Sequence, residues 1–160
     1  MKAEIGDATA AAERILRSDN IFTVTDSNVA DLYPSLFAGV RHTVIPAGEK
    51  YKTLDTVGKI VSDMVSAGCD RQTTLVAVGG GVTGDTAGFA AACFMRGVKW
   101  INVPTTLLAM VDSGIGGKTG VDVGGYKNVA GAFHMPGRVV VCRDFLRTLP
   151  EREWLCGCGE

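Results

Sequence analysis

The 160-residue sequence has little of what marks several classes of protein. It contains two histidines and five prolines, only 7% of it is aromatic, and its formal net charge is −1. A chain so near neutrality lacks the basic surface that binds nucleic acids or anionic membranes. It has no apolar run long enough to span a membrane, and Glu4, Asp7 and Glu13 make its N-terminus unlike a signal peptide. We therefore expect neither a nucleic-acid partner nor a membrane.

The cysteines also argue against a disulfide framework. There are five, an odd number, and Cys93 lies within an apolar helical pattern. We expect reduced thiols and a cytoplasmic chain. The pair Cys156-x-Cys158 has a spacing that metal sites use, but an isolated pair without partners is weak evidence for a metal.

Short β-branched or apolar runs alternate with helical patterns along the chain. Strands are predicted at Ile21–Thr25, His42–Pro46, Thr74–Val78, Trp100–Val103 and Arg138–Cys142. The first predicted helix has Asp7 as its cap and runs to Arg17, and the second begins after Asp26 and is disturbed by Pro34. Further helices are predicted at Lys52–Ser66, Asp85–Met95 and Thr105–Asp112, and a last one begins near Leu149. This alternation predicts an α/β fold, Rossmann-like, with a mostly parallel sheet and helices on both faces. The loops after the strands should then share one edge, where ligands bind.

The last predicted helix has a recognisable start. Thr148 and Glu151 have the spacing of a capping box, and Pro150 would lie in the first turn. We expect Thr148 to cap this helix.

Three consecutive glycines, Gly79–Gly81, separate a predicted strand from a predicted helix in the stretch "GGGVTGD". Such a turn can present backbone N–H groups and a positive helix end to a phosphate. The stretch is not a Walker loop, because no Lys-Ser/Thr pair follows it. The alternative, a tight turn with close packing and no ligand, remains open from these residues alone.

Polar residues follow the first two predicted strands as well. Asp26 could accept a hydrogen bond from a ribose hydroxyl and Asn28 could bond an adenosine group, although a simple helix N-cap is the alternative. Glu49 and Lys52 would share one face of a first helical turn, and the alternative there is a pair of solvated charges.

The stretch after the fourth predicted strand combines a carboxylate with cations. Thr105 and Asp112 are seven residues apart and should share a helix face, which would leave Asp112 partly buried. Lys118 could pair with Asp112 or meet a substrate anion. Further cations, Arg96, Lys99 and Lys127, lie in neighbouring loops of a nearly neutral chain. They indicate a small anionic ligand.

Several motifs in order resemble the 3-dehydroquinate synthase family of sugar phosphate cyclases. They are "PAGEKYKT", "GGGVTGDTAGFAAACFMRGV", "VPTTLLAMVDSGIGGKTGV", "KNVAGAF" and "LRTLPERE". The resemblance implies a synthase that uses NAD and a divalent metal, zinc or cobalt, to convert the small phosphorylated sugar acid 3-deoxy-D-arabino-heptulosonate 7-phosphate to 3-dehydroquinate in the shikimate pathway. It also implies a homodimer for the full-length protein.

The resemblance assigns residues by motif. NAD contacts would be Asp26, Asn28, Glu49, Lys52, Gly80, Gly81, Val82, Asp85, Thr105, Thr106, Lys127, Phe145, Leu146, Arg147 and Thr148. Substrate contacts would be Arg96, Asp112, Lys118 and Asn128, and the metal ligand Glu160. His42 and His134 match no family ligand, so we expect them to be structural.

The family's other two metal ligands are histidines of a helical C-terminal domain that this sequence does not contain. We expect residues 1–148 to form the NAD-binding domain and residues 149–160 to begin the missing one, so the metal site would be incomplete and this chain alone inactive. Two alternatives remain. One is a related cyclase or metal-dependent polyol dehydrogenase, and the other is a stand-alone NAD-binding module without catalysis.

Overall fold

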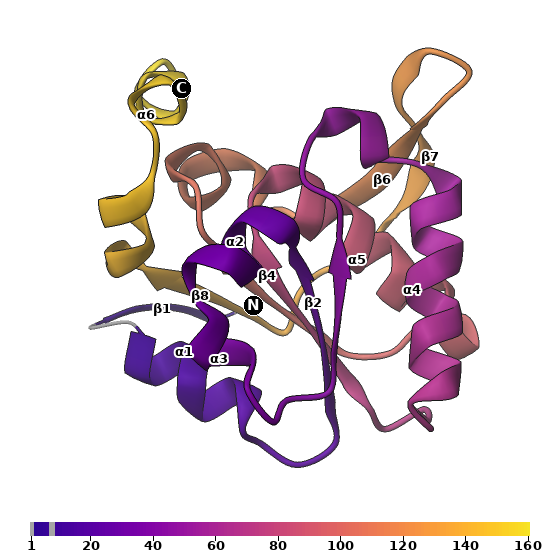
Figure 1. Cartoon of the computed structure of the whole chain (residues 1–160). Coiled ribbons are helices and arrows are strands. Elements are labelled where there is room, and N and C mark those ends of the chain that lie inside the picture. The colour runs from indigo at the N-terminus through magenta and orange to yellow at the C-terminus, as the bar shows by residue number, and fades with distance from the viewer. Residues whose placement is uncertain (1, 7–8) are drawn as a thin grey trace.

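A computed structural model describes residues 2–6 and 9–160 (Figure 1). Its centre is a six-stranded sheet in the order β1-β8-β5-β4-β2-β3. The strands are β1 (Lys2–Gly6), β2 (Ile21–Asp26), β3 (His42–Ile45), β4 (Thr74–Gly79), β5 (Trp100–Pro104) and β8 (Arg138–Cys142). Every neighbouring pair is parallel. The carboxyl ends of all these strands therefore lie along one edge, as predicted.

Helices cover both faces of the sheet, which confirms the predicted α/β class (Figure 1). One face carries α1 (Thr9–Leu16), α2 (Ser27–Leu32) and α3 (Pro34–Phe37), and the other carries α4 (Leu54–Ser66) and α5 (Gly81–Cys93). Alternate residues of β4 enter the two cores, since Leu75 packs on the α4–α5 side and Val76 on the other. Both side chains are fully buried, which explains why this strand reads as a continuous apolar run.

A β-hairpin that the sequence analysis missed lies outside the main sheet. It consists of β6 (Lys118–Val123) and β7 (Tyr126–Phe133), which pair antiparallel. The linking residues, Gly124 and Gly125, have φ angles of +60° and +84°, the conformation that a two-residue hairpin turn requires. β6 packs on α5 where Gly88 leaves room: a Cβ there would lie 2.5 Å from the Thr119 methyl group. The hairpin lies on the α4–α5 side of the molecule and extends beyond the carboxyl edge of the main sheet (Figure 1).

Other helix bounds differ from the sequence analysis. Asp7, the expected cap of the first helix, lies outside the described residues, and β1 was not predicted. The prediction that α5 begins at Asp85 was wrong, because the chain is already helical at Gly81. That helix ends at Cys93, and a 3₁₀ turn, Phe94–Arg96, follows it. In the part of the chain that the structure describes, every helix is too short or too polar to cross a membrane.

The segment after β5 also departs from an ordinary helix. It becomes helical only at Leu107 and continues as a π-helical turn, Ala109–Ser113. The wider turn and late start mean that Thr105 and Asp112 do not share a helix face. Asp112 is exposed, so its expected partial burial was wrong.

The capping box at the last helix was wrong too. The helix α6 (Glu151–Cys158) has Pro150 as its N-cap and no side-chain cap bond. Thr148 belongs to the preceding 3₁₀ turn, Arg143–Thr148, where its hydroxyl bonds the Phe145 carbonyl at 3.2 Å and the Tyr33 hydroxyl at 2.6 Å. Its capping oxygen is therefore already engaged.

Candidate functional site

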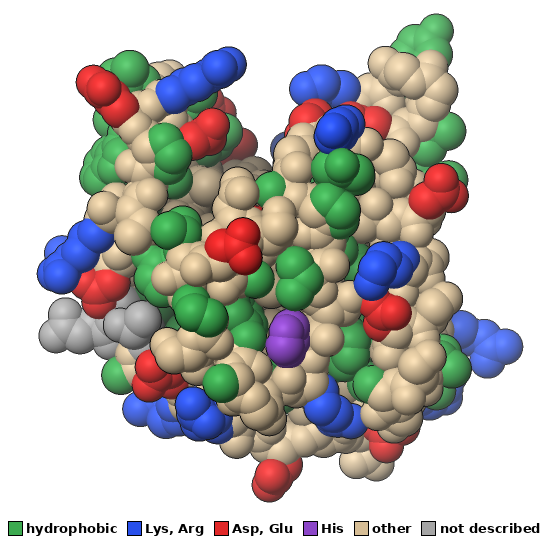
Figure 2. Space-filling view, viewed as in Figure 1, with side chains coloured by type: hydrophobic (Ala, Val, Ile, Leu, Met, Phe, Trp, Pro, Cys, Tyr) green, Lys and Arg blue, Asp and Glu red, His purple; other side chains and the backbone are tan. Residues whose placement is uncertain are grey.

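A cavity of about 700 Å³ opens at the carboxyl edge of the sheet. Its walls come from the loops after β2, β3, β4, β5 and β8 and from the start of α6. The space-filling view is hollowed at its top, between α6 and the loop that follows β3 (Figure 2). The predicted cofactor contacts that line it are Asp26, Asn28, Glu49, Lys52, Gly80, Gly81, Val82, Asp85, Thr105, Thr106, Phe145 and Thr148. The structure thus gathers most of the predicted cofactor contacts in one place.

The amino end of α5 points into this cavity. Gly80 is its N-cap, with an extended ψ of −171° and no side-chain cap bond. The N–H groups of Gly81, Val82 and Thr83 belong to the first turn, where no intrahelical acceptor exists. These groups and the positive end of the helix dipole form a place for an anion.

None of the three glycines has a positive φ, so close packing distinguishes these positions and a left-handed backbone does not. A Cβ on Gly79 would lie 2.5 Å from atoms of the Thr83 side chain, one on Gly80 3.0 Å from the Thr106 methyl group, and one on Gly81 2.9 Å from the Ser113 hydroxyl. Tight packing, the alternative left open by the sequence, is therefore present. It leaves the helix end open to the cavity, so it does not compete with anion binding.

Asp26 connects two elements at the floor of the cavity. One carboxylate oxygen accepts a hydrogen bond from the Val29 N–H at 3.1 Å, which caps α2, and the other accepts from the Thr83 hydroxyl at 2.9 Å. Asp26 is 8% exposed. The N-cap alternative is thus confirmed, and a contact with ribose stays a prediction.

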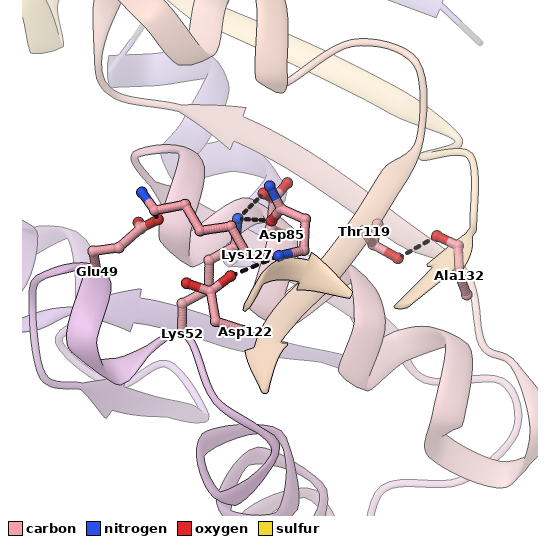
Figure 3. Close-up of polar contacts among 8 residues, drawn as sticks. Glu49, Lys52, Asp85, Thr119, Asp122, Lys127 and Ala132 are labelled. Carbon is pink, nitrogen blue, oxygen red and sulfur yellow. Dashed lines mark hydrogen bonds and ion pairs between the residues drawn. The ribbon is translucent and has the colours of Figure 1, made fainter. Parts of the chain in front are cut away.

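Lys52 carries a buried ammonium group between two loops. Its Nζ lies 2.6 Å from Asp85 Oδ2 and 2.5 Å from Asn128 Oδ1, and the residue is 5% exposed (Figure 3). The alternative interpretation, a solvated charge, is therefore excluded for Lys52. Glu49 lies in a 3₁₀ turn and meets Lys127 Nζ at 3.0 Å on the surface, so the expected shared helix face was wrong. The cause is that α4 begins later, at Leu54.

Asp85 is an unusual carboxylate because its pKa is raised. Burial favours its neutral form more than the hydrogen bond from Lys52 favours the charged one, and the carboxylates of Glu49 and Asp112 add to the rise in the pKa. The ion pair at 2.6 Å therefore compensates only in part for the loss of water.

This raised pKa predicts a pH dependence of stability. In the pH range between the ordinary aspartate pKa and the raised one, the folded chain holds a proton that the unfolded chain has lost. The free energy of unfolding should therefore fall as pH rises through that range, relative to the Asp85→Asn variant. Urea unfolding of both proteins across the acid range measures this difference. A difference that is constant or grows with pH would contradict the prediction.

A second cavity of about 450 Å³ adjoins the first. It shares Asp85, Ser113 and Asn128 with the first cavity. Asp112 and Lys118 also line it, so three of the four predicted substrate contacts come together here.

Arg96 is the exception among the predicted substrate contacts. The helix α5 has 13 residues and carries the chain roughly 20 Å, back to the opposite edge of the sheet. Arg96 lies there with Thr74, Trp100 and Arg138, at the amino ends of their strands. Within one copy of the chain it does not reach either cavity at the carboxyl edge.

Three predicted cofactor contacts engage other groups. Leu146 packs against the core on the α1 side, Arg147 pairs with Asp144 at 3.3 Å, and Lys127 pairs with Glu49. These residues flank the first cavity, whereas Phe145 and Thr148 line it.

Ser113 is a site residue that the sequence analysis missed. It lines both cavities, and its buried hydroxyl has no hydrogen-bond partner among the residues that the structure describes. Its position depends on the π-helical turn, which a helical pattern of 3.6 residues per turn cannot reveal.

The described residues do not form a metal site. Glu160 lies exposed at the end of the chain, and residues 2–6 and 9–160 contain no group of three His, Cys, Asp or Glu side chains that could hold an ion. Both histidines hydrogen-bond to carbonyl groups, His42 to Val40 at 2.8 Å and His134 to Val98 at 2.9 Å. The ring of His134 also stacks on Trp100. Their structural role agrees with the prediction.

The fold and the site define a domain of the open parallel α/β class, with a cavity at the carboxyl edge of the sheet, where ligands bind in such folds. The chain belongs to the 3-dehydroquinate synthase N-terminal family, whose model matches residues 42–156. This confirms the resemblance seen in the motifs.

Named relatives agree with this assignment. A 3-dehydroquinate synthase of Rhodospirillum rubrum is 46% identical over 98% of this chain, and the chain spans 43% of that relative's length. A 2-epi-5-epi-valiolone synthase of Streptomyces hygroscopicus, solved with NAD⁺ and Zn²⁺ bound, is 31% identical with a TM-score of 0.89 over 98% of this chain and 47% of its own. A 2-deoxy-scyllo-inosose synthase, solved with carbaglucose-6-phosphate, NAD⁺ and Co²⁺, is 30% identical with a TM-score of 0.84 over 98% of this chain and 46% of its own.

Proposed function

We propose that this chain is the NAD-binding part of a 3-dehydroquinate synthase, which converts 3-deoxy-D-arabino-heptulosonate 7-phosphate to 3-dehydroquinate and phosphate in the shikimate pathway. The identity of 46% to a relative of that name, against 31% and 30% to two other cyclases, favours this reaction over a related one. The observation that carries the cofactor assignment is the open amino end of α5 in the first cavity. The five free cysteines support our proposal of a cytoplasmic location.

The first cavity supplies groups for each part of a dinucleotide. The N–H groups of Gly81, Val82 and Thr83 would meet the pyrophosphate, and Asp26 and Asn28 the adenosine half. Thr105 and Thr106, after β5, would border the rest of the cofactor. When bound, NAD supplies reversible hydride transfer, which amino-acid side chains cannot provide.

The second cavity would hold the substrate next to the cofactor. Lys118 and the Asn128 side chain offer hydrogen-bond donors to an anionic group, and Asp112 offers an acceptor to hydroxyl groups. Because the two cavities share Asp85, Ser113 and Asn128, the ligands would meet at these residues. The described residues alone do not supply three ligands for a metal.

Calorimetric titration of NAD into the 160-residue chain tests the cofactor assignment. We expect saturable binding at about one equivalent, because the cavity already brings the loops of five strands together. A chain that is folded by circular dichroism but gives no saturable heat would contradict the assignment. The Gly58→Val variant should bind NAD as the wild type does, because a Cβ at Gly58, in α4, meets no atom within 4 Å.

A further inference from the structure

Asp122, in the β6–β7 hairpin, lies where the ladder of hydrogen bonds is interrupted. Val121 pairs with Ala130 and Val123 with Tyr126, so Asp122 alone faces the three residues 127–129 of β7. Such a bulge takes residues out of the ladder and redirects their side chains. Here it turns Lys127 and Asn128 toward the loop after β3, where they meet Glu49 and Lys52.

The Asp122 carboxylate holds the bulge in place. Its Oδ1 accepts a hydrogen bond from the Asn128 N–H at 2.7 Å. Asn128 has a φ of +54°, in the left-handed region that residues other than glycine seldom occupy. This conformation brings Asn128 Oδ1 within 2.5 Å of Lys52 Nζ.

Asp122 also holds the backbone of Lys52. Its own N–H, freed from the ladder, donates to the Lys52 carbonyl at 2.8 Å. Asp122 thus holds the backbone of both Lys52 and Asn128, and the side-chain amide of Asn128 meets the ammonium group of Lys52. Figure 3 shows Asp122 beside Lys52, with Asp85 beyond the ammonium group.

We propose that Asp122 is a positioning residue, which sets the Lys52–Asp85–Asn128 network at the boundary of the two cavities by holding both Lys52 and Asn128. The proposal rests on the proposed function in so far as the network contacts NAD and substrate. It does not require Asp122 to touch either ligand.

The test compares Asp122→Ala with Asp122→Asn, whose side-chain oxygen can still accept the Asn128 N–H. Two quantities are measured: hydrogen exchange of the Asn128 amide in the ligand-free chain, and the dissociation constant for NAD. For Asp122→Ala we expect exchange to be faster and NAD binding weaker, each by about tenfold, the effect of one lost hydrogen bond. Asp122→Asn should restore both values to within about twofold. Asp31→Ala, which removes an exposed carboxylate on α2, is the matched control.

Wild-type values of both quantities in Asp122→Ala would overturn the proposal, and so would equal losses in Asp122→Asn. If the wild-type chain does not bind NAD, the proposed function fails, while amide exchange alone still decides the role of Asp122.

If Asp122→Ala does not fold, the Asn128→Gly background replaces it, because glycine adopts a left-handed φ without help. There we expect Asp122→Ala to fold, because the left-handed conformation of residue 128 no longer depends on the hydrogen bond to Asp122. Loss of folding in that background as well would overturn the proposal.

Discussion

Replacing Gly81 with valine should weaken NAD binding by at least about 100-fold, because two or more charge-assisted hydrogen bonds to the pyrophosphate would be lost. A Cβ at this position points toward the Ser113 hydroxyl, 2.9 Å away, and Ser113 lines both cavities. The branches of valine would therefore lie between the first turn of α5 and any anion beside it. Calorimetric titration of NAD measures the loss.

The chain itself should tolerate this change, because the one close contact is with a small side chain that can rotate. Two further variants separate the effect on packing from the effect on NAD binding: Gly81→Ala alone, and Gly81→Ala combined with Ser113→Ala. In the double variant, Ser113→Ala removes the hydroxyl that the new methyl group at position 81 meets. Equal thermal midpoints with weakened NAD binding would support the assignment. If Gly81→Val binds NAD as tightly as the wild type, the cofactor does not lie at the amino end of α5.

Replacing Lys52 with methionine should lower the free energy of unfolding by about 3 kcal/mol, because it leaves the Asp85 carboxylate buried without its cation. The two side chains are only 6% and 18% exposed, so water cannot replace the lost partner. Urea unfolding at neutral pH measures the loss. The deficit should shrink in acid, where Asp85 takes up a proton and no longer needs the ammonium group.

Lys59→Met is the matched control for this prediction. Lys59 forms an i,i+4 ion pair with Asp63 on α4, but its side chain is 51% exposed. Its removal should cost about 0.5 kcal/mol, the range of solvent-exposed pairs. A Lys52→Met variant no less stable than Lys59→Met would show that the buried ion pair contributes no more to the fold than a solvent-exposed pair.

Much of the main sheet could be predicted because its central strands β2 and β4 are buried on both faces. The runs at 21–25 and 74–78 are almost wholly β-branched or apolar, and β2 and β4 occupy them. The edge strand β1 was missed because it is short: the alternation of charged and apolar residues in "KAEIG" is a strand signal, but it extends over only five positions. The hairpin was missed although its Gly124–Gly125 turn is visible in the sequence.

The cavity could be predicted in outline, but its internal contacts could not. Parallel strands place the loops after them at one edge whatever those loops contain. Lys52, however, meets Asp85 from 33 residues away and Asn128 from 76, and the second contact needs a left-handed residue. Ser113 depends likewise on a π-helical turn. Local patterns do not encode these features.

The three residues shared by the two cavities limit how such a protein can change during evolution. A substitution at Asp85, Ser113 or Asn128 alters both cavities at once, so the proposed NAD site and the proposed substrate site cannot change there independently of each other. Asp112 and Lys118 line only the second cavity, so substitutions at these positions leave the first cavity unchanged. Divergence toward a new substrate should therefore begin at positions of this kind, which line only the second cavity, with the shared residues unchanged.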